Sequence, residues 1–195
     1  MVTAVYSGYT LYFASNRAFA HGDISYCLCQ ARDFVWGAQL GWDGVAILAP
    51  EHREKLNFLS RLARLRAKAL DYFVYGELVE VLEPKNEIRM LSGTWNRPGG
   101  DGPISLSAVH AARWSAEDGS VAVVIANADT ASHEFSFAWT GGEGNYGSHK
   151  RWSVERVTAD AHEGLPDQEG NEFTYAVDVP GRDGVILIFQ KKDGV

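Results

Sequence analysis

The periodicity of the apolar residues changes at Gly76, and this change limits the folds open to the chain. Before Gly76, the runs 24–36 and 51–75 repeat apolar residues at spacings of three and four, as amphipathic helices do. After it, short runs rich in β-branched and aromatic residues alternate with turn signals such as "EDGS" and "PGRDG". The charge changes too, because residues 1–76 hold eight Lys and Arg against six Asp and Glu, and residues 77–195 hold ten against nineteen. We therefore predict two domains, 1–76 and 77–195.

The first domain is predicted to run strand, helix, strand, helix. Residues 4–14 contain no charge and suit a strand that is covered on both faces, and residues 38–42 form a second, short strand. Asp23 stands before the helical run 24–36 in the position of an N-cap. Short connections in this order indicate parallel strands joined by right-handed crossovers.

The second domain is predicted to be an antiparallel β-sandwich. Alternation is clearest in "HEFSFAW", where Phe135, Phe137 and Trp139 share one side of the strand. About seven such runs in roughly 115 residues, each bounded by Gly, Pro or Asp turns, are typical of sandwiches. The runs are "ELVEVLEP", "ISLSAVHAARWS", "SVAVVIANA", "HEFSFAWT", "KRWSVERVTA", "EFTYAVDV" and "GVILIFQKK".

The overall composition argues against two classes of partner. A net charge of −7 and a pI near 5.3 do not favour nucleic acid or an anionic membrane surface. No apolar run approaches the ~20 residues of a membrane span, and no signal peptide is recognisable, so localisation is left open. Cys27 and Cys29 are interpreted as small buried hydrophobic residues because their spacing on a helix turns the two thiols apart.

Two segments carry a resemblance to a known family. "FVWGAQLGW" at 34–42 and "YFVYGELV" at 72–79, followed by an antiparallel β domain, resemble the carboxy-terminal end of a glycoside-hydrolase-type (β/α)8 barrel, most of all an uncharacterised bacterial group related to glycosidases. The resemblance implies an α/β plus all-β chain, with a partial TIM-barrel segment of two βα units before the sandwich. Two strands alone leave their edges unpaired. We therefore expect preceding polypeptide, or a partner chain, to complete the barrel.

In such barrels the ligand site lies at the carboxyl ends of the strands, here the loops 15–23 and 42–50. Glycoside hydrolysis usually requires two carboxyl groups, and Asp23 and Asp43 are the carboxylates expected on that face. Each has a structural alternative, a helix cap for Asp23 and a turn residue for Asp43. Because barrels of this type generally take their catalytic carboxylates from middle strands, we expect the main catalytic pair to lie outside this chain.

The predicted substrate-binding residues are therefore contacts to sugar. Trp42 is the strongest candidate, because an indole at a strand end can stack on a sugar ring, with core packing as the alternative. Gln39 is predicted to point into the barrel, and Trp36 to pack in the core. The full set of candidates is Trp42, Gln39, Asn16, Arg17, Asp43 and Asp23.

Other constellations are weak. The six histidines are scattered without a spacing that suits zinc, and no cofactor or metal is predicted. The aromatic residues of the β domain are expected mainly to fill the space between sheets, with Trp95 and Tyr146 the first candidates for exposure. These aromatic residues of the β domain are Trp95, Trp114, Trp139, Trp152, Tyr146 and Tyr175. The leading hypothesis is thus a carbohydrate-active hydrolase fragment acting on oligo- or polysaccharide, inactive by itself, with a non-catalytic carbohydrate-binding or structural module as the alternative.

Overall fold

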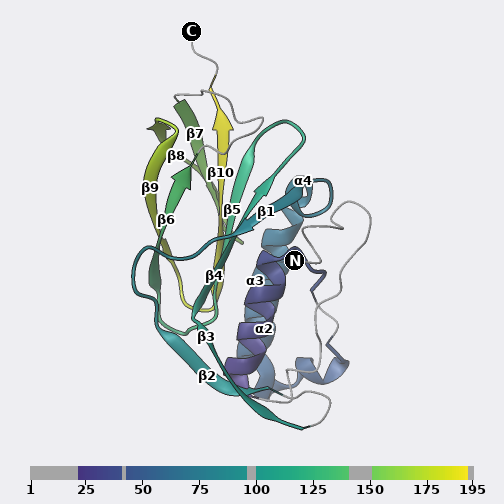
Figure 1. The fold of residues 1–195 in the computed structure, drawn as a ribbon. Helices are drawn as coiled ribbons and strands as arrows, with labels where there is room; N and C mark the ends of the chain where they lie inside the picture. The colour runs from purple at the N-terminus through teal and green to yellow at the C-terminus, as the bar shows by residue number, and fades with distance from the viewer. Residues whose placement is uncertain (1–21, 41–42, 96–99, 141–150, 193–195) are drawn as a thin grey trace.

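The computed structural model describes residues 22–40, 43–95, 100–140 and 151–192. It combines helices with antiparallel strands (Figure 1). The helices are α2 (Asp23–Val35), α3 (Arg53–Ala67) and α4 (Leu70–Phe73), with 3₁₀ turns η2 (Val45–Leu48) and η3 (Pro50–His52) before α3. The strands are β1 (Glu77–Val81), β2 (Met90–Trp95), β3 (Gly102–Ser107), β4 (Val109–Ser115), β5 (Val121–Asn127), β6 (His133–Thr140), β7 (Arg151–Val157), β8 (His162–Glu169), β9 (Glu172–Val179) and β10 (Asp183–Lys191).

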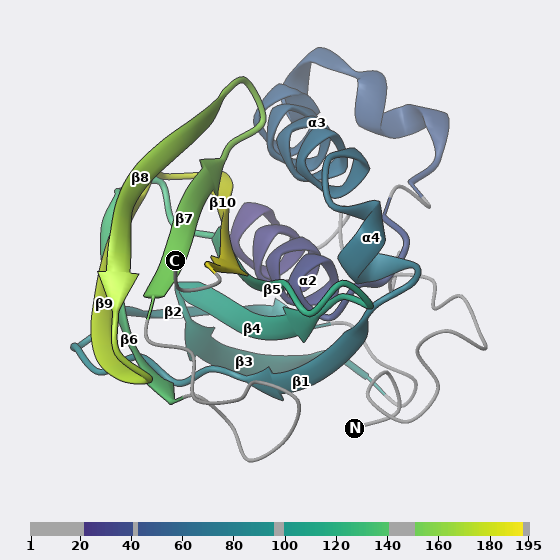
Figure 2. The same cartoon turned by 90° about the horizontal axis from the view of Figure 1, so that it is seen from above.

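Six of the strands form one sheet in the order β1-β4-β5-β10-β7-β8, and every pairing in it is antiparallel. Two further antiparallel pairs, β2-β3 and β6-β9, stand apart from this sheet. Seen from above, α2 and α3 lie on one side of the large sheet, and β6 and β9 lie on the other (Figure 2). The antiparallel pairing predicted after Gly76 is therefore present, arranged as one large sheet with a two-stranded ribbon over one face.

A single cluster of buried apolar residues connects the helices with the sheet. The Trp114 indole on β4 donates its Nε1 hydrogen to the carbonyl of Val35 at 2.9 Å, and its ring meets Phe73 edge-on with 5.4 Å between centroids. A Cβ on Gly37 would lie 2.6 Å from the Trp114 ring, so only glycine fits this approach, where φ is also 74°. The apolar core thus continues across the predicted boundary at Gly76.

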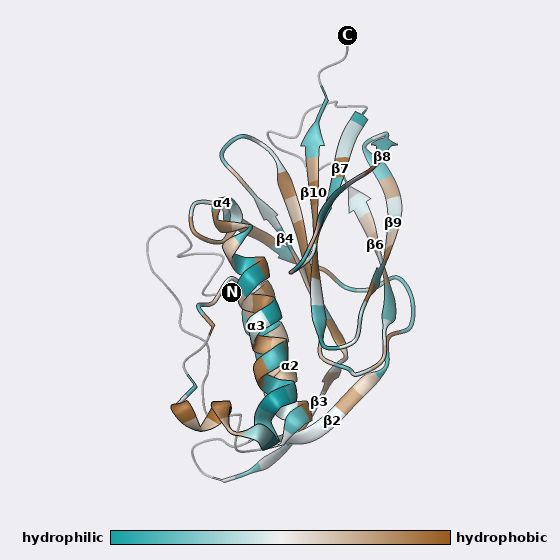
Figure 3. Ribbon diagram, turned by 180° about the vertical axis from the view of Figure 1, so that it is seen from behind, coloured by the Kyte–Doolittle hydropathy of each residue, from teal (hydrophilic) through white to brown (hydrophobic). Residues whose placement is uncertain are grey.

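The helical predictions are confirmed with one correction. The helix predicted at 24–36 is α2, and Cys27 and Cys29 are buried in it as expected. The helix predicted at 51–75 is interrupted after Lys68, so that α3 and α4 are separate. The interruption turns α4 toward the sheet, where Tyr72 and Phe73 become buried. Hydrophilic and hydrophobic residues alternate along the ribbon of α3 (Figure 3), and its exposed positions include Arg53, Glu54 and Arg64.

Two strands were not predicted, and one predicted run is divided. The run 104–115 is split at Ala108 into β3 and β4, and β2 was missed. β8 covers "LPDQE", whose Pro and Asp are typical of turns. Most of β8 is exposed because it is an edge strand, and its polar side chains hide the usual alternation.

The barrel prediction is only partly open to comparison with the structure. The strand predicted at 4–14 lies outside the described residues, as do residues 41–42. In the described part of the strand predicted at 38–42, Gln39 forms a single-residue β-bridge. The two-unit barrel segment therefore remains a prediction.

Candidate functional site

Three of the six predicted sugar contacts lie in the part of the chain that the structure describes. They are Asp23, Gln39 and Asp43, whereas Asn16, Arg17 and Trp42 lie outside it. Asp23 begins α2, and Asp43 follows the predicted second strand, so both lie at the ends of elements, as expected for loop-borne contacts. The two carboxylates engage different partners.

Asp43 is held by a tyrosine from α2. The fully buried Tyr26 donates its phenolic hydrogen to Asp43 Oδ2 at 2.8 Å. Burial raises the pKa of Asp43 above its usual value, although the hydrogen bond from Tyr26 opposes this shift. The second oxygen, Oδ1, is also buried, and none of the described residues donates a hydrogen bond to it. Asp43 therefore presents a carboxyl oxygen that a ligand hydroxyl or a bound water can satisfy.

Asp23 forms an ion pair and does not cap its helix. Its Oδ1 lies 3.1 Å from Lys55 Nζ of α3, with the carboxylate largely exposed and the lysine buried. The N-cap of α2 is Gly22, at a φ of 98° that a residue with a side chain rarely adopts, and no side chain caps the helix. The N-cap prediction for Asp23 is thus wrong by one residue, because the chain needs glycine at the cap. Asp23 instead ties α2 to α3.

Gln39 has an exposed side chain in the described structure. Its predicted orientation toward a barrel interior depends on strands that the structure does not describe, and it stays a prediction.

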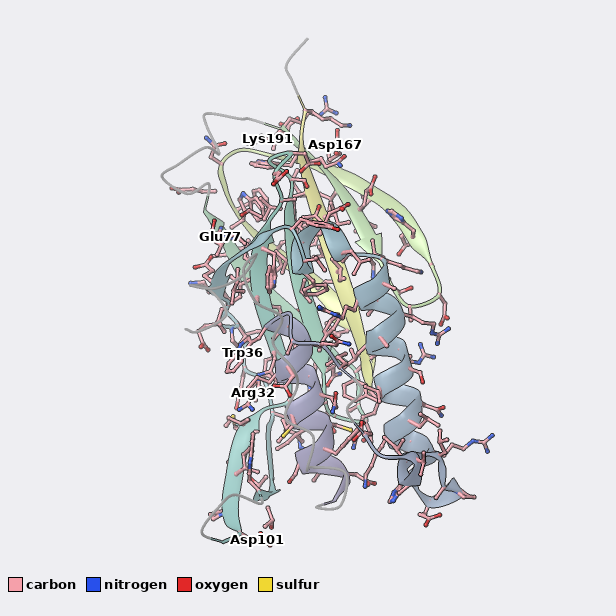
Figure 4. The ribbon with its side chains drawn as sticks, turned by 90° about the vertical axis from the view of Figure 1, so that its right-hand side faces the viewer. Arg32, Trp36, Glu77, Asp101, Asp167 and Lys191 are labelled. Atoms are coloured by element: carbon pink, nitrogen blue, oxygen red, sulfur yellow. The ribbon has the colours of Figure 1, made fainter. Side chains whose placement is uncertain are left out.

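The tryptophans of the β-rich part mainly fill the core, as predicted. The buried ones are Trp114, Trp139 and Trp152, each at most 2% exposed. Trp95 is half-buried, and the guanidinium of Arg32 lies 4.8 Å from its ring centroid and 5.0 Å from that of Trp36. Figure 4 shows Arg32, near the end of α2, close to Trp36, which directly follows the helix. The guanidinium of Arg32 occupies a face of the Trp95 ring that a sugar would need. Tyr146, the other candidate for exposure, lies outside the described residues.

At this site, Asp43 is the carboxyl group that offers an oxygen to a ligand. Hydrolysis by paired carboxylates needs two such groups about 5–9.5 Å apart across the sugar. Here Asp43 accepts a hydrogen bond from Tyr26, and Asp23 forms an ion pair with Lys55. In the described ranges no group of His, Cys, Asp and Glu is placed to hold a metal ion. Nor does any helix within those ranges have the length and apolarity to cross a bilayer.

Sequence reasoning missed Tyr26 and Lys55, the two residues that hold these carboxylates. Tyr26 was available as a signal, because a tyrosine inside a helix that is about to be buried needs a hydrogen-bond partner for its hydroxyl. Lys55 offered no comparable signal, since lysine is rarely buried.

The comparisons with known proteins give structural neighbours only. No protein-family model matches the chain, and no curated protein matches it in sequence. A GH27 β-L-arabinopyranosidase from Geobacillus stearothermophilus aligns with 89% of this chain and 31% of its own length, at 8% identity and a TM-score of 0.41. A GH51 arabinofuranosidase from Xanthomonas axonopodis pv. citri aligns with 50% of this chain and 21% of its own, at 18% identity and a TM-score of 0.30.

A third solved structure is the catalytic domain of the GH30 xylanase C from Talaromyces cellulolyticus, with 17% identity, a TM-score of 0.29, and coverage of 49% of this chain and 21% of that one. These neighbours are glycoside hydrolases, and the chain spans less than a third of their length. At such TM-scores the likeness is too partial to decide either the fold or the activity.

Proposed function

We propose that this chain is the carboxy-terminal part of a glycoside hydrolase and contributes a sugar subsite rather than the catalytic pair. The resemblance of "FVWGAQLGW" and "YFVYGELV" to the end of a glycosidase barrel supports this proposal. In it, preceding polypeptide or a partner chain completes the barrel, and an oligo- or polysaccharide is the substrate. Trp42, Gln39, Asn16 and Arg17 join the carboxylates at the subsite.

The observation that carries the subsite is the Tyr26–Asp43 pair. Tyr26 fixes one oxygen of the carboxyl, and the other is buried and has no donor among the described residues. A sugar hydroxyl is a donor of suitable size for such an acceptor, and a buried acceptor gains more from being satisfied than an exposed one. Asp43 thus suits the binding of a hydroxyl.

Chain 1–195 is expected to show no turnover of aryl glycosides by itself, because hydrolysis needs a pair of carboxyl groups and we expect that pair to lie in other polypeptide. A longer gene product that includes the preceding polypeptide is expected to hydrolyse them. In that product, Asp43→Asn should raise KM about tenfold, the usual size for loss of one hydrogen bond to a charged acceptor, with a smaller change in kcat.

Asp160→Asn is the matched control. It removes a carboxylate of the same type from exposed ion pairs with Arg61 and Arg64 and should change KM little. Hydrolysis by the isolated chain that disappears in Asp43→Asn would contradict the proposal, because Asp43 would then belong to a complete catalytic centre.

A structural role is the second candidate, and the shared core favours it. α2 and α3 pack on the six-stranded sheet, where Trp114 lies against them, and Trp139 and Trp152 are buried on the other face. In this alternative the β-rich part braces the end of the barrel and binds no sugar. In the longer product, unchanged KM values for both variants would support it.

A further inference from the structure

A cavity of about 360 Å³ lies where α4 meets the sheet, and none of the three predicted sugar contacts that the structure describes, Asp23, Gln39 and Asp43, lines it. Its walls come from the end of α3, from α4, from the turn between β4 and β5, and from β7 and β10. Figure 1 shows α4 beside the sheet at this point. The volume falls within the range of pockets that bind small ligands, about 300–1,000 Å³. We call this space the α4 cavity.

An exposed aromatic ring stands on the wall of the α4 cavity. Tyr75 is 70% exposed, whereas Tyr26 and Tyr72 are at most 5% exposed. Tyr75 is not needed for the packing of the core. In this segment the core ring is that of Phe73, which lies against Trp114. An exposed ring beside a cavity offers a flat apolar face on which a ligand can stack.

The polar wall of the α4 cavity is held in place by its own hydrogen bonds. Tyr72 Oη and Ser120 Oγ are 2.8 Å apart, and Ser120 donates its hydroxyl and backbone hydrogens to Asp118 Oδ1 at 2.6 and 2.8 Å. Lys68 Nζ donates to the carbonyl of Thr158 at 2.9 Å. A wall ordered in advance loses little side-chain entropy when a ligand binds.

A second part of the wall offers planar acceptors and an amide. Glu155 Oε2 lies 2.7 Å from His162 Nε2, which orients the carboxyl group, and Gln190 adds an amide with both donor and acceptor atoms. Carboxylates and amides pair with adjacent hydroxyl groups, because each presents two polar atoms in one plane. The combination of a stacking ring with such planar groups matches the two faces of a sugar, one apolar and one edged with hydroxyls.

The charge of the α4 cavity restricts the ligand further. Among the described residues, the lining holds four carboxylates, from Asp71, Glu117, Asp118 and Glu155, against the single ammonium of Lys68. A ligand that carries carboxylate or sulfate would be repelled by this lining. No three of these groups form a metal cluster in the described residues, and the excess of carboxylates disfavours an anionic ligand.

We propose that the α4 cavity binds one uncharged sugar unit of a glycan, stacked on Tyr75 and hydrogen-bonded through Glu155 and Gln190. The choice of sugar as ligand rests on the carbohydrate role proposed above, but the site is separate from Asp43. It would hold the protein on a polysaccharide while other residues carry out hydrolysis.

The test is calorimetric titration of the whole chain with cellotetraose and xylotetraose, and with tetragalacturonate as the anionic probe. Binding of at least one neutral tetrasaccharide with a dissociation constant of about 1 mM is expected, with no binding of the uronide. No binding of either neutral probe, or equal binding of the anionic one, would overturn the proposal.

Variants locate the binding. Tyr75→Ala should weaken it about tenfold, and Tyr75→Phe should weaken it less, since the ring remains. Glu155→Gln should weaken it several-fold, whereas Glu163→Gln, which removes a similar exposed carboxylate from an ion pair with Arg156, should not. An unaltered affinity in Tyr75→Ala would also overturn the proposal.

Asp43→Asn separates this proposal from the previous one. The α4 cavity predicts full glycan binding in Asp43→Asn, even if the longer gene product shows no hydrolysis at all. Loss of binding in Asp43→Asn together with full binding in Tyr75→Ala would assign the sugar to the Asp43 subsite and refute the α4 cavity.

Discussion

The two faces of the six-stranded sheet are built from different kinds of side chain. The face toward α2 and α3 carries mostly small residues at the centre of the sheet. Gly184 on β10 lies against Leu62 and Leu65 of α3, and its strand neighbour on β5 is Ala126. Ala112 and Val124 face each other one step along the same side. Small side chains allow the helix backbones to lie close to the sheet.

The opposite face carries large aromatic residues. Trp139 of β6 lies 5.1 Å from Trp152, 5.5 Å from Phe173 and 4.4 Å from Phe189, measured between ring centroids. These rings come from the sheet and from the β6-β9 ribbon. A two-stranded ribbon has little backbone bulk, so wide side chains must fill the layer. The helices thus cover mostly small residues, with Trp114 as the large exception, and the ribbon covers large rings.

Removing one large ring should have the greatest effect. Trp139→Ala is expected to lower the free energy of unfolding by about 3–5 kcal/mol, because Trp139 is 2% exposed and the ribbon cannot collapse to fill the space. Trp139→Phe should cost much less, and Trp95→Ala, at a half-buried tryptophan, less again. Urea unfolding checks the order. A loss below about 1 kcal/mol in Trp139→Ala would show that the ribbon does not form a firm second layer.

Acid should weaken the helix-covered face next. Burial, assisted by the positive charge of Arg32, lowers the pKa of His110 from 6.5 to about 4. Between these values the unfolded chain binds a proton that the folded chain does not, so stability falls as the pH drops from about 6.5 toward 4. The expected loss is about 3 kcal/mol at 1.36 kcal/mol for each unit of pKa.

Urea unfolding at pH 7, 5.5 and 4.5 measures this dependence. His110→Gln should remove this contribution while the other titrating groups stay the same, so the difference between the two proteins isolates His110. Parallel pH curves for both proteins would mean that His110 is free to take up a proton in the folded state.

The smallest effect is expected from filling the space at Gly184. A Cβ there would lie 2.9 Å from Leu65 Cδ1 and 3.1 Å from the carbonyl oxygen of Ile125. Gly184→Val should therefore cost about 1–3 kcal/mol, since α3 must move away from the sheet. Gly164→Val on the edge strand β8, where nothing lies within 4 Å, is the control and should cost little. Equal losses would mean that the helix contact is not tight.

Sequence patterns identified the elements whose residues pack against one partner. β6 was found at its full extent because alternating Phe135 and Phe137 face the core and Ser136 does not. β8 was missed because an edge strand needs no apolar alternation. The break between α3 and α4 was missed because the leucine stripe continues through it, and only the contact of Phe73 with Trp114 explains it.

The candidate site was predictable only in part, because its contacts join residues that lie far apart in the sequence. Asp43 was selected from its place at the end of a predicted strand. Its partner Tyr26 lies seventeen residues earlier in the chain, and periodicity within one element carries no information about such a pairing. The α4 cavity joins residues from 68 to 190, so no local pattern in the sequence indicates it.

The contact of Gly184 with α3 has a practical consequence for anyone who clones parts of this gene. A piece that starts at Glu77 would present Ala112, Ala122 and Val124 to water over a broad flat area, and such a product is expected to precipitate. The smallest soluble unit should begin upstream of Gly22, so that both covering helices are made together with the strands they shield.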